Sequence, residues 1–403
     1  MTPLATFAKL TTRRFNLFFL NQKYVWHFAP VILLMAEGMG RTWNFFLYEQ
    51  SKLYNSDMTL DITEQDIRTP KGINYIDPLN RTKLNEAFVM GAASIERYRN
   101  EIQIIKEDLG CNALRVAGGN INKAIEIGKT SLEMGITPWM SPRFCGNTFE
   151  ATKNHLRDYV ECCVANGLEY CPLIVANELL FDCTDIIRTN TTSTKERHEE
   201  IHEMLKKGER PDVTEKVIEL IQIARQLGWK GPLTYAAFAY ETVKWEMIGD
   251  ENLIIAANLY WERDLETEQA KTRDHYEGKI RKLESQAGTR RVVITEFGVT
   301  PHQNTLAYGG GSFKLRGSVD YSAQAEALDQ YLSVIQNHPK VGYFLYSFEE
   351  EQNPFREGNF GVVNIKRSIL RTPEYTLTEA AKKFSTFNKT RSSDEHGIEV
   401  NTD

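Results

Sequence analysis

Eight short apolar runs recur along this chain, and segments with helical periodicity separate them. Each run is five or six residues long and apolar along its length, which is the pattern of a strand buried on both faces of a parallel sheet. The runs lie at residues 72–76, 113–117, 136–140, 171–176, 233–237, 253–258, 291–295 and 341–345. Strands that alternate with helices in this way form either a closed barrel or an open, doubly wound sheet.

The segments between the runs carry the pattern of amphipathic helices. Ser322 is a candidate N-cap of the helix before the eighth run. No Gly-x-Gly-x-x-Gly motif follows an early run and no complete phosphate-binding loop occurs, which disfavours an open nucleotide-binding sheet. We therefore predict an α/β protein that folds as a single-domain (β/α)8 TIM barrel with an extra N-terminal segment. Apolar side chains repeat on one helical face at Leu156, Tyr159, Val160 and Cys163, and again at Leu328, Tyr331, Leu332 and Ile335.

Composition supports a folded protein and narrows its partners. The 403-residue chain is 41% hydrophobic and 25% charged, so it has enough apolar material for a sizeable core. Its net charge of −6 at pH 7 argues against nucleic acid as a main partner, because phosphate binding needs a basic surface.

The two ends of the chain differ from the predicted barrel, which we place at residues 58–388. The first 36 residues of the N-terminal extension, 1–57, contain no acidic side chain, a bias that is typical of a targeting sequence. The extension would instead be non-structural if Met58 were the true start. Its apolar stretch at 25–35 is about half the length that spans a bilayer, so we expect no stable membrane insertion. The polar tail at 389–403 is expected to be disordered.

All six cysteines fall between residues 111 and 183, and no pair has the spacing of a zinc ribbon. A secreted protein held by disulfides usually spreads its cysteines along the chain. We therefore expect thiols and a cytoplasmic protein. The acid-free N-terminus leaves an organelle as the alternative, and secretion is disfavoured.

Two glutamates stand where apolar runs end. Asn177 and Glu178 follow the fourth run, and Glu296 follows the seventh, 118 positions later (296 minus 178). The carboxyl ends of barrel strands meet at one face, so both side chains can converge there. One carboxyl group that donates a proton and a second that attacks or activates water are the minimum for hydrolysing a glycosidic bond. The structural alternative for either residue alone is a helix cap or an ion pair with arginine.

These residues resemble the signatures of the cellulase-like clan of retaining glycoside hydrolases, whose members share a (β/α)8 barrel. Asn177-Glu178 resembles the Asn-Glu pair that closes strand four of the clan, which implies that Glu178 is the acid/base. The Val-Ile-Thr-Glu-Phe-Gly run at 293–298 resembles the strand-seven signature, which implies that Glu296 is the nucleophile. The layout also resembles uncharacterised barrel proteins described as cellulase-like or abortive-infection proteins.

Three further matches follow the clan in order, and the resemblance covers about residues 70–387. The segment at 71–75, Lys-Gly-Ile-Asn-Tyr, is similar to the strand-one signature. Arg115 resembles the strand-two arginine that holds the nucleophile ionised, and Tyr260 resembles the strand-six tyrosine that hydrogen-bonds to it.

Two positions depart from the clan, and they put cellulose itself in doubt as the substrate. Asn258 stands where the clan commonly has a histidine, and the strand-eight tryptophan that forms a sugar platform is missing. Phe348 or Tyr346 would then be the side chain that stacks on a sugar. The other candidates for substrate contacts are Asn258 itself, Trp139, Trp261, Glu349 and Glu350.

Physical chemistry assigns a task to several of these side chains. Apolar walls and a second carboxylate should raise the pKa of Glu178 towards neutrality, as a general acid requires. Asn177 is placed to hydrogen-bond a sugar 2-hydroxyl, a contact that strengthens in the transition state. Arg143, after the third run, is within reach of a ligand, although loop arginines are usually solvated.

The sequence therefore predicts a retaining glycoside hydrolase that cleaves a β-glycosidic bond of an oligo- or polysaccharide by double displacement. Its partner is a carbohydrate substrate, and this chemistry requires no metal and no organic cofactor. The alternative is a catalytically inactive carbohydrate-binding barrel, which the two departures motivate. A metal-dependent hydrolase is disfavoured because none of the eight histidines stands at a strand end.

Overall fold

The computed structural model describes eight segments of the chain, which together contain the predicted barrel strands. They are residues 69–76, 92–187, 194–238, 241–260, 273–301, 320–349, 360–368 and 371–397. The predicted N-terminal extension, 1–57, lies outside these residues.

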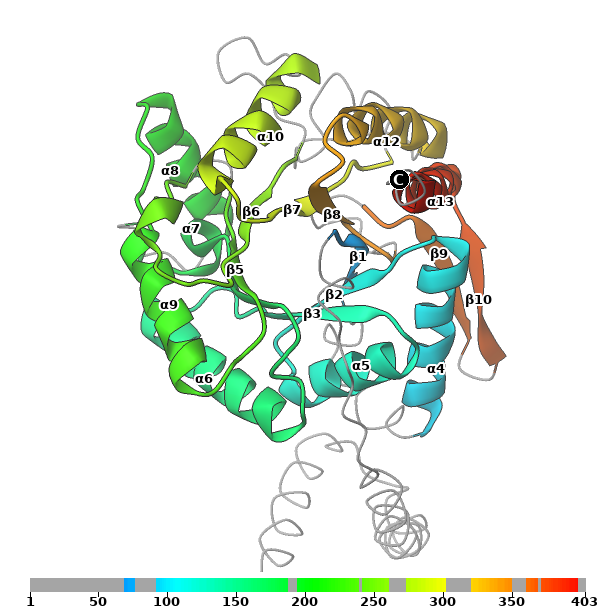
Figure 1. The fold of residues 1–403 in the computed structure, drawn as a ribbon, viewed down its shortest axis with the longest axis horizontal. Helices are drawn as coiled ribbons and strands as arrows, with labels where there is room; N and C mark the ends of the chain where they lie inside the picture. The colour runs from blue at the N-terminus through cyan, green and yellow to red at the C-terminus, as the bar shows by residue number, and fades with distance from the viewer. Residues whose placement is uncertain are drawn as a thin grey trace, which may run out of the picture. The chain divides into compact units, whose positions relative to one another are not determined.

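Eight parallel strands form a single sheet that curves into a ring, with helices around its outside (Figure 1). Their order is β5-β4-β3-β2-β1-β8-β7-β6. Two parallel bridges, Leu233 to Leu253 and Ala237 to Ala257, connect β5 to β6 and bring the ends of the sheet together. The structure thus confirms the (β/α)8 TIM barrel.

Each strand coincides with a predicted apolar run to within two residues at either end. Continuous apolar sequence marks these strands because one face packs into the barrel and the other against the helices. The strands are β1 (Lys71–Ile76), β2 (Ala113–Gly118), β3 (Thr137–Pro142), β4 (Leu173–Asn177), β5 (Leu233–Ala236), β6 (Ile255–Asn258), β7 (Val292–Phe297) and β8 (Val341–Leu345).

Helices cover the outer face of the ring. The cap of α12 differs from the predicted one: Asp320, and not Ser322, is the N-cap, because its side chain accepts hydrogen bonds from the backbone N–H groups of Ser322 and Ala323. The described helices are α4 (Ala92–Gln103), α5 (Ile121–Glu133), α6 (Phe149–Ala165), α7 (Leu179–Asp182), α8 (Thr194–Lys206), α9 (Thr214–Gln226), α10 (Arg273–Ala287), α12 (Tyr321–Gln336) and α13 (Glu379–Gly397), with a π-helical turn η2 (Ile104–Asp108) and a 3-10 turn η3 (Trp245–Met247).

Side chains fill the interior of the barrel. Trp139 of β3 and Phe344 of β8 pack edge to face there, with ring centroids 5.1 Å apart, among small residues such as Ala256. Trp139 is fully buried in this cluster, so its placement argues against our expectation that it contacts a sugar. The larger core lies between the sheet and the helices.

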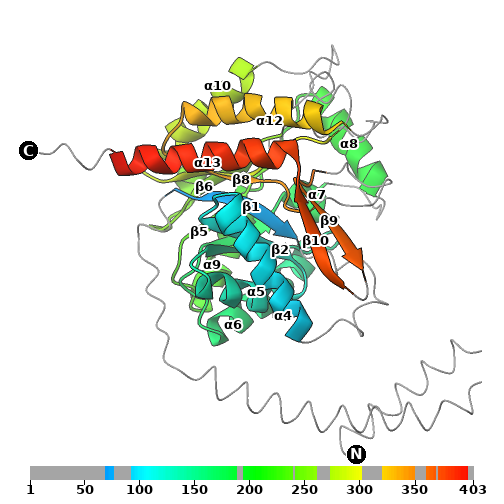
Figure 2. The same ribbon diagram turned by 90° about the vertical axis from the view of Figure 1, so that its right-hand side faces the viewer.

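Two elements follow the last barrel strand. The antiparallel hairpin β9 (Val363–Ser368) and β10 (Arg371–Leu377) lies near the carboxyl end of β1 (Figure 2). Helix α13 continues to Gly397, well into the 389–403 segment that we expected to be disordered. Buried Arg391 explains why: it donates hydrogen bonds to the carbonyls of Ile335, His338, Pro339 and Val341. The domain boundaries at residues 57 and 388 stay predictions.

Candidate active site

The two glutamates lie at the ends of two strands, β4 and β7, on the carboxyl face of the barrel, and β5 and β6 lie between these strands in the ring. Glu178 follows β4 directly, and Glu296 is the penultimate residue of β7. The sheet register pairs Asn258, at the end of β6, with Glu296. Asn258 Nδ2 also donates to Glu178 Oε1 at 2.8 Å, so a single side chain of β6 lies between the two glutamates.

Arg115 of β2 is the centre of the buried network. Its Nη1 donates to Glu296 Oε1 at 2.6 Å, and its Nη2 donates to Asn177 Oδ1 at 2.9 Å. Ser141 Oγ and the Thr295 carbonyl accept two further bonds, each at 3.2 Å. The guanidinium is completely buried and its charge is compensated by Glu296, which is 4% exposed. Arg115 therefore lies beside the predicted nucleophile.

Tyr260 supplies the second contact to Glu296. Its hydroxyl donates to Glu296 Oε2 at 2.5 Å, and burial together with the charge of Glu296 raises the pKa of Tyr260. Tyr276 Oη on α10 donates to the Tyr260 carbonyl at 2.8 Å, and this hydrogen bond fixes the backbone of Tyr260. Both carboxylate oxygens of Glu296 thus accept a hydrogen bond, one from Arg115 and one from Tyr260, and both donors are predicted site residues.

Glu178 has the properties expected of a general acid. Burial is the main cause that raises its pKa well above the usual value, and the charge of Glu296 adds to the rise, while the hydrogen bond from Asn258 opposes it. This is the direction that we predicted. Glu178 is also the only described non-glycine residue with a positive φ, 39°. Such left-handed backbone costs about 1–3 kcal/mol and is found where surrounding contacts enforce it.

Three contacts hold the strained turn after Glu178. The Glu178 N–H donates to the Ala236 carbonyl at 3.0 Å. The Leu179 N–H donates to Tyr235 Oη at 2.7 Å, and that hydroxyl donates to Glu241 Oε2 at 2.6 Å. Glu241 was missed by the sequence analysis, because it follows the fifth run by several residues and matches no motif.

Asn177 is the last member of the hydrogen-bonded network, and its Nδ2 donor is unsatisfied among the described residues. Its Oδ1 accepts from Arg115 and from Asn258 Nδ2, the latter at 3.1 Å. Its Nδ2 is buried and has no hydrogen-bond partner among the described residues. A buried amide donor without a partner is costly, so a ligand hydroxyl at this point would be favoured.

The aromatic and acidic residues after β8 that we predicted to contact a sugar differ in their burial and in their partners. Phe348 is 1% exposed and packs against Tyr75 with ring centroids 5.8 Å apart, which argues against our expectation that it stacks on a sugar. Half-buried Tyr346 lies edge to face with Tyr260, 6.2 Å between centroids. Half-buried Glu349 pairs with Val363 of β9. Trp261 and Glu350 lie outside the described residues.

Glycine at position 298 allows the exits of β7 and β8 to approach each other. A Cβ atom at Gly298 would lie 2.3 Å from the Tyr346 carbonyl oxygen, which no side chain tolerates. The last residue of the 293–298 signature is therefore explained by packing beside the site.

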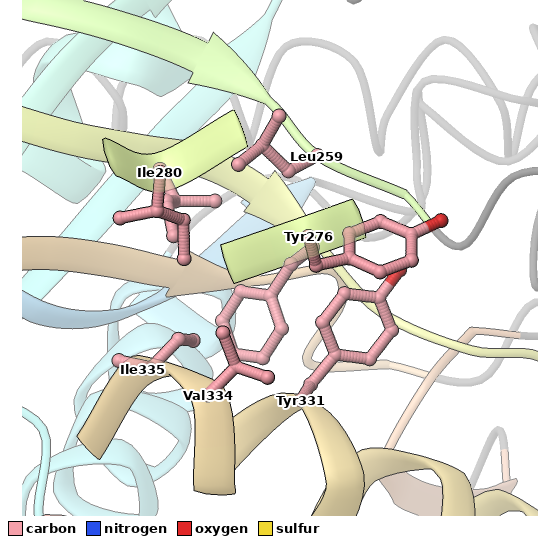
Figure 3. A pocket seen from close by; sticks show the side chains of 8 residues that line it. Leu259, Tyr276, Ile280, Tyr331, Val334 and Ile335 are labelled. Atoms are coloured by element: carbon pink, nitrogen blue, oxygen red, sulfur yellow. The ribbon is translucent and has the colours of Figure 1, made fainter. Parts of the chain in front are cut away.

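A small apolar gap lies outside the barrel, between the strands and helices α10 and α12 (Figure 3). Tyr276, Ile280, Tyr331 and Ile335 are among its lining side chains, and none of the residues that line it carries a charge. It offers no group for sugar chemistry. We interpret it as a packing defect next to Tyr276, the residue that supports Tyr260.

Other classes of site find little support in the described part of the chain. No group of three or more His, Cys, Asp or Glu side chains there is arranged to hold a metal ion. Among the same residues, no helix has both the length and the apolar content needed to cross a membrane.

Comparison with known proteins relates the fold to glycoside hydrolases. No family model and no curated protein matches the sequence. The chain is similar to a solved GH113 β-1,4-mannanase, with a TM-score of 0.52 and 13% identity, over 80% of this chain and 100% of that one. It is also similar to an FMN-binding β-glucuronidase from Facaelibacterium prausnitzii L2-6, with a TM-score of 0.52 and 14% identity, over 79% of this chain and 44% of that one. At these identities the likeness establishes a shared (β/α)8 barrel fold.

Proposed function

We propose that the protein is a retaining glycoside hydrolase that cleaves a β-glycosidic bond of an oligo- or polysaccharide. One observation carries the proposal: a single hydrogen-bonded network joins Glu178 to Glu296. It runs through Asn258, Asn177 and Arg115. Two solved proteins of the same fold are described as a β-1,4-mannanase and a β-glucuronidase, which motivates the choice of a β-linkage.

The proposed reaction has two steps. Glu178, kept protonated by its raised pKa, donates its proton to the glycosidic oxygen while Glu296 attacks the anomeric carbon. The leaving sugar departs and a glycosyl ester on Glu296 remains. Glu178, now ionised, takes a proton from water, whose oxygen attacks the anomeric carbon and releases Glu296. Arg115 balances the charge of Glu296 before attack and after release.

The decisive test is Glu296→Gln assayed with activated aryl β-glycosides. We expect kcat/KM to fall by at least about 10³-fold, because removal of a nucleophile usually costs more than that. The fold should persist, since glutamine keeps the size of the side chain. Glu150→Gln, an exposed change on α6, is the matched control. Turnover by Glu296→Gln at the wild-type rate would refute the assignment.

Two measurements test the retaining mechanism separately. An aryl 2-deoxy-2-fluoroglycoside should leave a sugar adduct on the peptide that contains Glu296, detected by mass spectrometry. NMR of the first product should show the β-anomer. An adduct on another residue, or the α-anomer, contradicts double displacement through Glu296.

A second candidate is a carbohydrate-binding barrel without catalysis. Asn258 in place of the clan histidine favours it, as does the loss of the strand-eight tryptophan, where Tyr346 is the nearest aromatic residue. Such a protein would bind oligosaccharides with similar affinity before and after Glu296→Gln, and would hydrolyse none of them.

We also propose a reducing compartment, the cytoplasm, as the location. The six cysteines are free thiols, and four of them are buried, which is typical of proteins that do not depend on disulfides.

A further inference from the structure

A second arginine lies at the carboxyl face of the barrel, and its bonding is incomplete. Arg143 directly follows β3, and 27% of its side chain is exposed. Its Nε is 3.2 Å from Cys145 Sγ and 3.9 Å from Asp182 Oδ2. Neither Nη atom has a hydrogen-bond partner among the residues that the structure describes. The forked end of the guanidinium is therefore open.

The positive charge of Arg143 acts on the catalytic pair. Burial raises the pKa of Glu178 most, and Arg143 is one of the groups that work against that rise. Burial also lowers the pKa of Arg143 itself, but its neighbours outweigh this effect and raise it. These neighbours are Cys145, Asp182, Tyr346 and Glu296. Arg143 thus lies close to both glutamates and to the aromatic residue after β8.

Arg115 shows what a structural arginine looks like in the same pocket. It is completely buried and donates to four acceptors from three strands, β3, β4 and β7. Arg143 lies beyond the end of the next strand, β3, and its Nη atoms have none of these acceptors. A half-buried guanidinium whose Nη donors have no hydrogen-bond partners costs folding free energy, and a ligand that supplies acceptors offsets this cost.

We propose that Arg143 binds an anionic substituent of the substrate, a carboxylate or a sulfate group on the sugar, at the face of the barrel that carries Glu178 and Glu296. The inference rests on the proposed glycosidase function. A guanidinium is planar and presents paired N–H donors that match the two oxygens of such a group. Asp182 lies on the Nε side, so it leaves this paired edge free.

Matched substrates test the proposal by kinetics. Aryl β-glycosides are compared in pairs that differ only in the acidic group: glucoside with glucuronide, galactoside with galacturonide, and glucoside with its 6-sulfate. We expect the wild-type enzyme to prefer one acidic member. Arg143→Gln should lower the acidic-to-neutral ratio of kcat/KM by about 10- to 100-fold, the value of a charged hydrogen bond. Arg143→Lys should retain part of the ratio.

The acidic-to-neutral ratio of kcat/KM distinguishes recognition of the acidic group from an effect of Arg143 on acid catalysis by Glu178. Loss of Arg143 also changes the surroundings of Glu178, but this affects both members of a pair alike. Arg281→Gln, a 70% exposed arginine on α10, removes the same charge from the outer surface and should leave the ratio unchanged. A wild-type preference for every neutral member, or equal losses on both members in Arg143→Gln, overturns the inference.

A binding measurement tests the proposed anion site independently of the proposed hydrolysis. Glucuronate, galacturonate, glucose 6-sulfate and glucose are titrated calorimetrically into wild-type protein and Arg143→Gln. Tighter binding of an acidic sugar that is lost in Arg143→Gln supports the site, even if Glu296→Gln shows that hydrolysis fails. The identity of that sugar distinguishes carboxylate from sulfate. Equal binding of acidic and neutral sugars, or no binding at all, refutes it.

Discussion

At the scale of single residues, Glu178 and Glu296 are the same side chain in different surroundings. Glu296 receives a charged donor, Arg115, and a phenol, Tyr260. Glu178 receives one neutral donor, Asn258 Nδ2, which Asn177 Oδ1 shares. A cation hydrogen-bonded to Glu296 and a neutral amide hydrogen-bonded to Glu178 favour the proton on Glu178. This difference in surroundings is the reason why we propose Glu178 as the acid and Glu296 as the nucleophile.

Asn258→Ala should shift the basic limb of the kcat/KM profile to higher pH. The amide donor favours the ionised form of Glu178, so its removal raises the pKa of Glu178 further. The profile is measured with an aryl glycoside between pH 4 and 9. Thr295→Val, which removes only the hydroxyl that donates to Asn258 Oδ1, is the control and should leave that limb in place. A shift to lower pH in Asn258→Ala would contradict this role.

At the scale of elements, the turn from β4 into α7 positions Glu178, the proposed acid. Helix α7 has four residues and follows the left-handed backbone of Glu178 directly. It is too short to be stable alone. Glu241 holds it from outside, because its carboxylate accepts hydrogen bonds from the N–H groups of Leu180 and Phe238 and from the Tyr235 hydroxyl. Glu241, in the segment after β5, thus stabilises the turn and the short helix α7 that follow β4.

Glu241→Gln should change how stability depends on pH. Burial raises the pKa of Glu241 from 4.5 to about 7, so the folded protein binds this proton more tightly than the unfolded chain does. Its contribution to stability is therefore present below pH 4.5 and is lost as the pH rises through about 7.

Urea unfolding at several pH values between 5 and 8 measures this effect. The stability of the wild type relative to Glu241→Gln should fall as the pH rises. Glu209→Gln, an exposed change, should show no such trend. A difference that stays constant with pH would show that Glu241 does not titrate in this range.

At the scale of the whole molecule, α13 connects parts of the chain that are far apart in sequence. Lys71 Nζ at the start of β1 donates to Ser392 Oγ at 2.8 Å. Asn388 accepts from Tyr343 Oη of β8 at 2.7 Å and donates to the Leu109 carbonyl at 2.8 Å. The helix therefore ties together the region where β1 and β8 pair.

Arg391→Met should destabilise the protein by about 2–4 kcal/mol, because the carbonyls that Arg391 satisfies would be left buried without a donor. The free energy of unfolding in urea measures the loss. Lys382→Met, an exposed change on the same helix, should cost less than about 0.5 kcal/mol. An Arg391 variant as stable as the control would mean that this end of α13 contributes nothing to the fold.

Local sequence pattern determined the strands and the approximate place of the proposed catalytic pair. A strand buried on both faces needs continuous apolar sequence, so β8 was found at its full length, Val341–Leu345. Parallel strands of a barrel end at one face, so Glu178 and Glu296 were expected together despite their separation. The resemblance of Arg115 and Tyr260 to a known clan anticipated their contacts with Glu296, which the fold realises.

Other features were decided only by the tertiary structure. Glu241 supports the turn after Glu178, and Phe348 packs against Tyr75. The Nη atoms of Arg143 have no partner among the described residues, and α13 extends to Gly397. None of these follows from local periodicity, because each depends on which side chains meet after the ring of strands has closed. A sequence pattern specifies which faces are buried, whereas partners and exposure at those faces are set by contacts between residues that are distant along the chain.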